Sequence, residues 1–178
     1  MADQVYIILF RGIGGATQLP TAPLREALVG AGFRNVATYI NSGNVVLRTD
    51  MPRDAMLERV AALCAERFGF RKEIYAPSLG EWTEAVARCP FTPSQGKDLH
   101  IAWLAATPAP ARLDALRALA VPGEGIEVIG NIAYLHTPGG VSHSKLGVKF
   151  DKGVGVPNTA RNWNTALKLR DLGEAAAR

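Results

Sequence analysis

The stretch NVATYINSGNVVLRT, residues 35–49, decides the fold of this protein. Residues 35–40 and 44–49 are rich in the β-branched and aromatic side chains that favour strands, and the turn sequence Asn-Ser-Gly-Asn joins them. A turn of this composition between two such runs is a strong hairpin signal. The sequence therefore predicts two adjacent antiparallel strands here.

The elements on either side of this hairpin complete a known pattern. The continuous apolar run VYIILF, residues 5–10, is typical of a strand covered on both faces. Helices are predicted at 21–32, with Thr21 as N-cap, and at 50–69, and the run RKEIYA, residues 71–76, is a closing strand. The order strand, helix, strand, strand, helix, strand is the signature of a split βαβ, or ferredoxin-like, half.

The pattern then restarts. Ser78 and Glu81 form a capping box for a connecting helix. The run at 99–106 is a strand, a helical face follows, and the strands at 126–130 and 132–136 meet in a second hairpin. We therefore predict an α+β fold of two ferredoxin-like halves with antiparallel or mixed sheets, linked by a helix. The expected division is 1–77 for the first half, 78–98 for the connecting helix and loop, and 99–178 for the second half.

The segment 137–158 holds five glycines and three lysines, and only Val148 and Phe150 indicate a short strand. We expect it to be weakly structured, and a segment of this kind inside a compact domain is usually functional or mobile. Its part at 139–145 offers backbone amides, the hydroxyl of Ser144 and the ammonium of Lys145, a group that can hold phosphate. The alternative is a solvated loop.

A helix is expected from Thr159, capped by Asn158 or Thr159 itself. Helical spacing places Trp163 on the core side and gathers a polar strip on the opposite side. The helix dipole would add to an anion site there. The alternative is a capped surface helix with Trp163 in the core and Asn162 bonded to a loop.

Arg11 ends the first buried strand, where a charge needs water, a partner or a ligand. We expect the first and third strands of a half to run parallel, so that the loop of Arg11 and the segment of Lys145 leave corresponding edges and can meet. The predicted ligand-binding residues are Arg11, Ser144, Lys145, Arg161, Asn162, Asn164, Thr165 and Lys168.

The composition sets the class of protein. The chain has 178 residues, a net charge of +4 and a pI near 9.3, which favours anionic partners. Cys64 and Cys89 lack a CxxC spacing, and Cys64 lies on an apolar helical stripe, so reduced thiols are expected. The first apolar run is too short for a signal peptide and no run is long enough to span a membrane, so we expect a cytoplasmic protein.

The sequence nominates no catalytic group. The three histidines have no metal-ligand spacing, and no general acid, base or nucleophile stands out. Whether the protein is an enzyme, and with which cofactor, stays open at this point, and no metal is expected.

The motifs YIILFRGIGG, GFRNVATYINSGNVVL, the Ser-Lys pair at 144–145 and NTARNWNTALKL resemble those of a bacterial family of uncharacterised proteins, domain of unknown function 1697 (DUF1697). The resemblance covers essentially the whole chain and implies an α+β fold without an assigned activity or catalytic residues. One departure is that Gly14 follows Ile13, where the family loop carries an Asn-Val pair.

These observations lead to one main hypothesis and two alternatives. The main one is that the protein binds a small anionic or phosphorylated ligand at a basic site between the halves. A nucleic-acid-binding module is less favoured, because the strand at 44–49 lacks the aromatic residues that stack on RNA bases. The third possibility is a structural or protein-interaction role for the tryptophan helix.

Overall fold

The computed structural model describes residues 3–14 and 17–178, so Gly15 of the motif YIILFRGIGG lies outside the described residues. In the same motif, Gly12 and Gly14 have positive φ angles of 70° and 135°, which glycine adopts without strain. The chain packs into two units. Unit 1 comprises Met1–Glu84 and Lys168–Arg178, and unit 2 comprises Ala85–Leu167.

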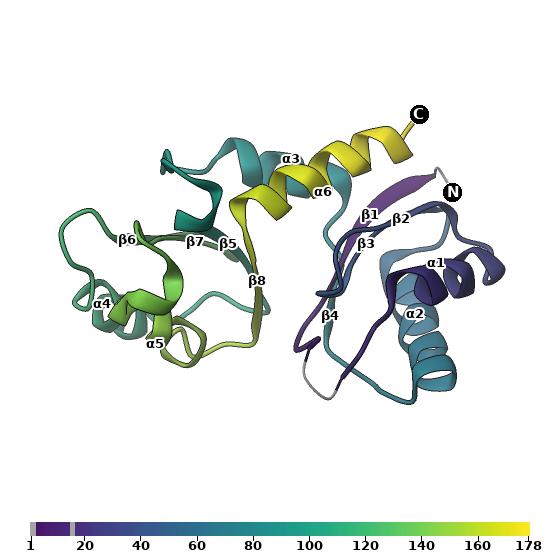
Figure 1. Ribbon diagram of the computed structural model, residues 1–178, viewed down its shortest axis with the longest axis horizontal. Helices are drawn as coiled ribbons and strands as arrows, with labels where there is room; N and C mark the ends of the chain where they lie inside the picture. The colour runs from purple at the N-terminus through teal and green to yellow at the C-terminus, as the bar shows by residue number, and fades with distance from the viewer. Residues whose placement is uncertain (1–2, 15–16) are drawn as a thin grey trace. The chain divides into compact units, whose positions relative to one another are not determined.

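Unit 1 contains the predicted ferredoxin-like half (Figure 1). Its four strands form an antiparallel sheet in the order β2-β3-β1-β4, and β1 pairs with β3 from Gln4–Thr49 to Leu9–Asn44. The elements are β1 (Gln4–Phe10), α1 (Thr21–Gly30), β2 (Arg34–Thr38), β3 (Asn44–Thr49), α2 (Arg53–Phe68) and β4 (Ile74–Tyr75).

The core of unit 1 lies between the sheet and its two helices. Tyr6, Ile8 and Phe10 of β1 alternate toward this side, and they pack with buried residues of both helices such as Leu28 and Val60. Ile7 faces the other side, where Gly173 lies so close that a Cβ there would be 3.2 Å from Ile7 Cδ1. Both faces of β1 are therefore covered, as its continuous apolar sequence predicts.

Unit 2 repeats this arrangement with the sheet order β6-β7-β5-β8, again with antiparallel pairing throughout (Figure 1). The fold is α+β with two similar halves, as predicted. The elements of unit 2 are η1 (Gly96–Asp98), β5 (Leu99–Leu104), α4 (Pro110–Arg117), β6 (Gly125–Ile129), β7 (Ile132–His136), η2 (Val141–His143), α5 (Lys145–Gly153) and β8 (Asn158–Asn162). Two helices, α3 (Leu79–Ala87) and α6 (Trp163–Ala176), contribute residues to both units.

The prediction of a weakly structured segment at 137–158, with a short strand at Val148 and Phe150, is wrong. A 3-10 turn and the helix α5 occupy it. Leu146 and Phe150, four residues apart, are buried in the core of unit 2, and Ser144 caps the helix by accepting a hydrogen bond from the backbone N–H of Gly147 at 3.0 Å. The sequence analysis did not predict this helix because Gly147 and Gly153, two poor helix formers, lie within it.

The predicted start of the last helix is also wrong. Residues 158–162 form the edge strand β8, which pairs with β5, and the helix begins at Trp163. The strand supplies the fourth member that a ferredoxin-like half requires. Short polar sequences such as NTARN carry little strand signal on their own, so the pairing partner decides their conformation.

Two smaller expectations also fail. The first and third strands of each half run antiparallel, because a hairpin reverses the chain between the second and third. The C-terminal ends of the first and third strands therefore lie at opposite ends of the sheet. The loop of Arg11 follows a first strand and the segment of Lys145 follows a third strand, so the two do not leave corresponding ends of their sheets.

The predicted helix caps have different outcomes. Helix α1 begins after Pro20 without a side-chain cap, so Thr21 is not an N-cap. By contrast, the capping box of Ser78 and Glu81 is confirmed by reciprocal bonds of 2.7 and 3.2 Å.

Candidate functional site

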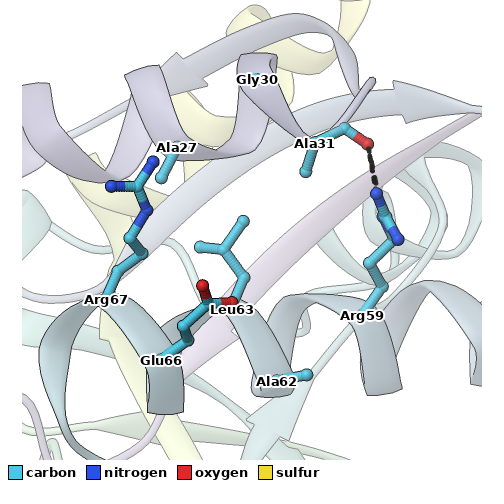
Figure 2. Close-up of a pocket in the computed structure, with 8 residues that line it drawn as sticks. All are labelled: Ala27, Gly30, Ala31, Arg59, Ala62, Leu63, Glu66 and Arg67. Carbon is cyan, nitrogen blue, oxygen red and sulfur yellow. Dashed lines mark hydrogen bonds between the residues drawn. The ribbon is translucent and has the colours of Figure 1, made fainter.

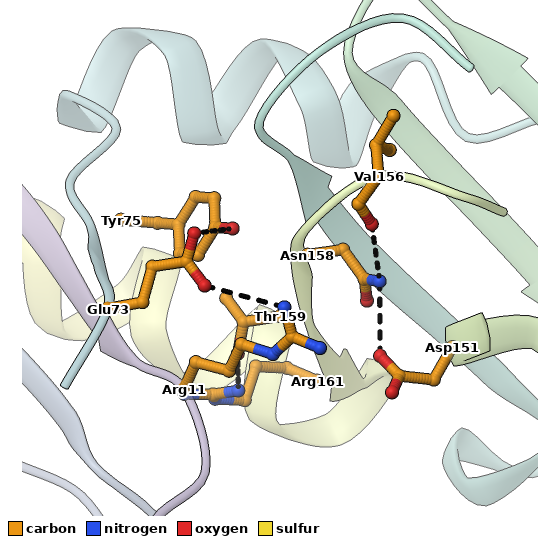
Figure 3. Close-up of polar contacts among 8 residues, drawn as sticks. All are labelled: Arg11, Glu73, Tyr75, Asp151, Val156, Asn158, Thr159 and Arg161. Carbon is orange, nitrogen blue, oxygen red and sulfur yellow. Dashed lines mark hydrogen bonds and ion pairs between the residues drawn. The ribbon is translucent and has the colours of Figure 1, made fainter. Parts of the chain in front are cut away.

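Arg161 is a buried residue of β8 and not a surface group of a helix. The residue is 9% exposed, and its Nη1 donates to Thr159 Oγ1 at 2.7 Å (Figure 3). The same Nη1 donates to the Ala160 carbonyl at 2.8 Å. Burial lowers the pKa of the guanidinium to about 10, so it stays charged at neutral pH. These contacts tie Arg161 to its own strand.

The other predicted residues of the C-terminal region divide by role. Asn162 Oδ1 accepts a hydrogen bond from the backbone N–H of Thr165 at 2.9 Å, so Asn162 is the N-cap of α6. Thr165 is buried, whereas Asn164 and Lys168 are exposed. Trp163, expected in the core, is only half-buried. The predicted polar strip is interrupted because Arg161 lies in β8 and Thr165 is buried, which leaves Asn164 and Lys168 as its exposed members on α6.

Arg11 belongs to a small polar network in unit 1. Its Nη1 lies 3.4 Å from Glu73 Oε2, and the Tyr75 hydroxyl donates to Glu73 Oε1 at 3.0 Å (Figure 3). Burial together with the neighbouring Glu73 carboxylate raises the pKa of Tyr75 to about 12. Arg11 and Arg161 lie in different units, so their predicted meeting stays a prediction.

Ser144 and Lys145 lie at the start of α5, beside a surface groove between α4 and α5 in unit 2. The groove consists of two hollows of about 360 and 400 Å³, which adjoin because Leu119 and Lys149 line both. We call it the basic groove. Its lining residues are Arg112, Ala115, Leu116, Leu119, Ser142, His143, Ser144, Lys145, Val148, Lys149, Lys152 and Gly153.

Helical spacing explains how the basic groove forms. Lys145, Val148, Lys149 and Lys152 are related by steps of three and four residues, so they share one face of α5. Arg112, Ala115, Leu116 and Leu119 repeat the same spacing along α4 and into the turn after it. The core residues Leu116, Leu146 and Phe150 hold the two helices against the sheet.

The groove is electrostatically one-sided. Arg112, Lys145, Lys149 and Lys152 line it, and no Asp or Glu is among the described residues that line the two hollows. Asp151, the acidic residue of the α5 sequence KLGVKFDKG, instead accepts a hydrogen bond from Asn158 Nδ2 at 3.1 Å (Figure 3).

This arrangement of positive charges lowers the stability of the ligand-free protein. Lys145 and Lys149 are like charges four residues apart, a pairing that destabilises a helix. Lys145 is also the first residue of α5, where the helix dipole disfavours a cation. An anion bound in the groove would relieve both costs.

The first half provides an internal comparison. A hollow of about 310 Å³ lies between α1 and α2, at the place that corresponds to the basic groove in the repeated fold (Figure 2). Its charged lining residues are Arg59, Glu66 and Arg67, and Arg59 donates to the Ala31 carbonyl at the end of α1 at 3.2 Å. This hollow differs from the basic groove because its lining carries charges of both signs and because one of its arginines, Arg59, is hydrogen-bonded to the backbone.

Groups typical of covalent or metal chemistry do not gather in the described part of the chain. Residues 3–14 and 17–178 contain no cluster of three metal-ligating His, Cys, Asp or Glu side chains. Burial raises the pKa of the Cys64 thiol to about 11 and also raises that of Cys89. None of the helices formed by these residues has the length and apolarity needed to cross a membrane.

Of the residues that line the groove, Ser144 and Lys145 were among the predicted ligand-binding residues, whereas Arg112, Lys149 and Lys152 were not. The signal was present in the three- and four-residue spacing of the lysines, which points to one helical face once residues 145–153 are recognised as a helix. Arg161, Asn162, Asn164 and Thr165 are not among the residues that line the groove.

The fold and the groove define an α+β protein with two ferredoxin-like halves, the second of which carries a cationic groove between its helices. Residues 4–134 match the family model described as protein of unknown function (DUF1697), and the chain belongs to this family. The match ends before α5, so it covers one wall of the groove.

Solved structures agree with the fold. The chain is similar to the structure of the conserved bacterial protein SP0830 from Streptococcus pneumoniae, with 20% sequence identity and a TM-score of 0.67. The similarity covers 97% of this chain and 99% of that one. No curated protein matches the sequence.

Proposed function

We propose that the protein binds a small anionic ligand, a phosphate or carboxylate compound, in the basic groove between α4 and α5. The observation that carries the proposal is the convergence of Arg112 from one helix with Lys145, Lys149 and Lys152 from the other, with no acidic residue among the groove's lining residues. Surface lysines are usually interspersed with carboxylates, and here the hollow between α1 and α2 in unit 1 carries charges of both signs for comparison.

The nucleic-acid alternative has less support. An RNA-binding sheet of ferredoxin-like shape needs an open face with stacking aromatics. In unit 1, Gly173 lies against Ile7 on the face opposite α1 and α2, and in unit 2 the Tyr134 hydroxyl donates to the Ala85 carbonyl at 2.5 Å and its ring is buried. Neither observation favours nucleic acid.

A thermal-shift titration with pyrophosphate tests the proposal. Pyrophosphate should raise the unfolding midpoint of the wild-type protein, and the double variant Lys145→Gln, Lys149→Gln should lose most of that rise. Each lost charge-assisted contact reduces ligand binding by about 1.5–3 kcal/mol. The matched control is Arg59→Gln, Arg67→Gln, which removes the same charge from the corresponding hollow of the first half.

The control variant should respond to pyrophosphate like the wild type. Equal midpoint rises in all three proteins would show that the groove lysines do not bind the anion. Sodium chloride at matched ionic strength separates specific binding from screening, because screening acts on every exposed charge alike.

A further inference from the structure

Part of the lining of the basic groove is aliphatic, and we call this part the floor and the cationic residues the rim. The floor consists of Ala115, Leu116 and Leu119 on the α4 side and Val148 of α5. Val148 is 63% exposed, one of the four most exposed large hydrophobic side chains among the described residues. Because Leu119 lines both hollows, the aliphatic surface runs from one hollow into the other.

The lining offers little for recognising a sugar or a base. Its other polar side chains are Ser142 and His143 of η2 and Ser144, the N-cap of α5, whose hydroxyl already accepts a hydrogen bond from the Gly147 N–H. The described lining residues include no Asn, Gln, Asp or Glu to bind ring hydroxyls, and the imidazole of the exposed His143 is the one aromatic ring among them that could stack on a base.

Resting on the proposed function, we infer that the ligand is a monomeric amphiphilic anion, a phosphate or carboxylate head group attached to an alkyl or acyl chain. The chain lies on Leu119 and Val148, and the cations at the rim bind the head. Lys149 lines both hollows, so it reaches the head group whichever way the chain lies.

Isothermal titration calorimetry of the full chain with inorganic phosphate and with n-butyl, n-hexyl and n-octyl phosphate tests this assignment. All concentrations stay below those at which the ligands form micelles. Each added methylene buried in the groove should tighten binding by about two- to fourfold, the upper value corresponding to full burial. A head group bound without its chain would give equal affinities across the series.

Two substitutions separate the floor from the rim. Val148→Asn should reduce the gain per methylene and leave the affinity for inorganic phosphate unchanged, whereas Lys149→Gln should weaken every member of the series by a similar factor. Val121→Asn is the matched control, because Val121 is also largely exposed but does not line the groove. Leu119→Asn, at a half-buried floor position, repeats the floor test independently.

The outcomes distinguish a failure of the amphiphile assignment from a failure of the proposed anion site. Affinities that do not change with chain length but depend on Lys149 would overturn the amphiphile and leave the anion site in place. A chain-length effect that neither Val148→Asn nor Leu119→Asn reduces would also overturn it. If Lys149→Gln left the affinity for every member of the series unchanged, the proposed function itself would be contradicted. Co-sedimentation with anionic lipid vesicles but no binding of the monomeric series would assign the groove to a membrane surface and overturn the inference.

Discussion

Gly153, the last residue of α5, lies directly against Leu116 of α4: a Cβ at position 153 would lie 2.6 Å from Leu116 Cδ2. The two helices that form the basic groove therefore approach each other at a point where only hydrogen fits. Gly153 has no positive φ, so its requirement is space and not backbone conformation.

Gly153→Ala should lower the free energy of unfolding by about 1–3 kcal/mol, because the added methyl group overpacks a well-filled contact. Chemical denaturation measures it. Gly30→Ala is the control, since Gly30 ends α1 with nothing within 4 Å of its added Cβ, and it should be neutral or slightly stabilising. Equal stability of Gly153→Ala and wild type would show that Leu116 moves aside freely.

Asn162→Ala should cost about 1 kcal/mol of stability, because it removes the N-cap of α6. Asn162→Asp retains an oxygen that accepts from the Thr165 N–H and should restore most of the loss. Urea unfolding of the three proteins checks this. If the alanine variant were as stable as wild type but lost pyrophosphate binding, Asn162 would be a ligand-binding residue and not a cap.

His100 should make stability depend on pH. Burial lowers the pKa of its imidazole below the ordinary value of 6.5, and its Nδ1 has no hydrogen-bond partner among the described residues. As pH falls below about 6.5 the unfolded chain takes up a proton that the folded chain does not, so the free energy of unfolding decreases by up to ~1.4 kcal/mol per pH unit.

The measurement is denaturant unfolding at pH 7.5, 6.5 and 5.5, a range above the titration of most carboxylates. His100→Gln should show a smaller loss of stability on acidification than the wild type. His143→Gln, at an exposed histidine, serves as control and should keep the wild-type pH dependence. Parallel pH profiles for wild type and His100→Gln would contradict the prediction.

Cys64 should react with thiol reagents only after unfolding. It is 1% exposed and burial raises its pKa to about 11, so at pH 8 roughly 1 in 1,000 molecules carries the reactive thiolate. In a Cys89→Ser background, labelling in buffer should be more than about 100-fold slower than in denaturant. Comparable rates in the two conditions would place Cys64 outside the core.

The fold was predictable because its signals are local and repeated. The apolar run of residues 5–10, the hairpin at 41–44 and the capping box at Ser78 each specify their element from neighbouring residues. The second half follows the same order, so the architecture was predicted even where a strand was missed. Membership of the family and the α+β fold agree with that prediction.

The site was less predictable because it depends on packing between segments distant in sequence. Arg161 looked like a ligand-binding cation, but pairing of β8 with β5 buries it. The basic groove needs α4 beside α5, and Gly153 permits this contact because it lies against Leu116. Gly153 and Gly147, which lies against Val141, together made α5 look like a loop. The sequence identifies the charged residues, but it does not show which side chains from distant segments face them across the groove.

The central claim is tested most directly by one substitution, Lys145→Gln, measured for stability with and without pyrophosphate. Removing a cation from the first turn of α5 and from its pairing with Lys149 should raise the free energy of unfolding of the ligand-free protein by about 0.3–1 kcal/mol. Saturating pyrophosphate should stabilise the wild type, by about 2.7 kcal/mol at a hundred times its Kd, and the variant by clearly less. If the substitution destabilises the free protein, or if pyrophosphate stabilises both proteins equally, the groove between α4 and α5 is not an anion-binding site.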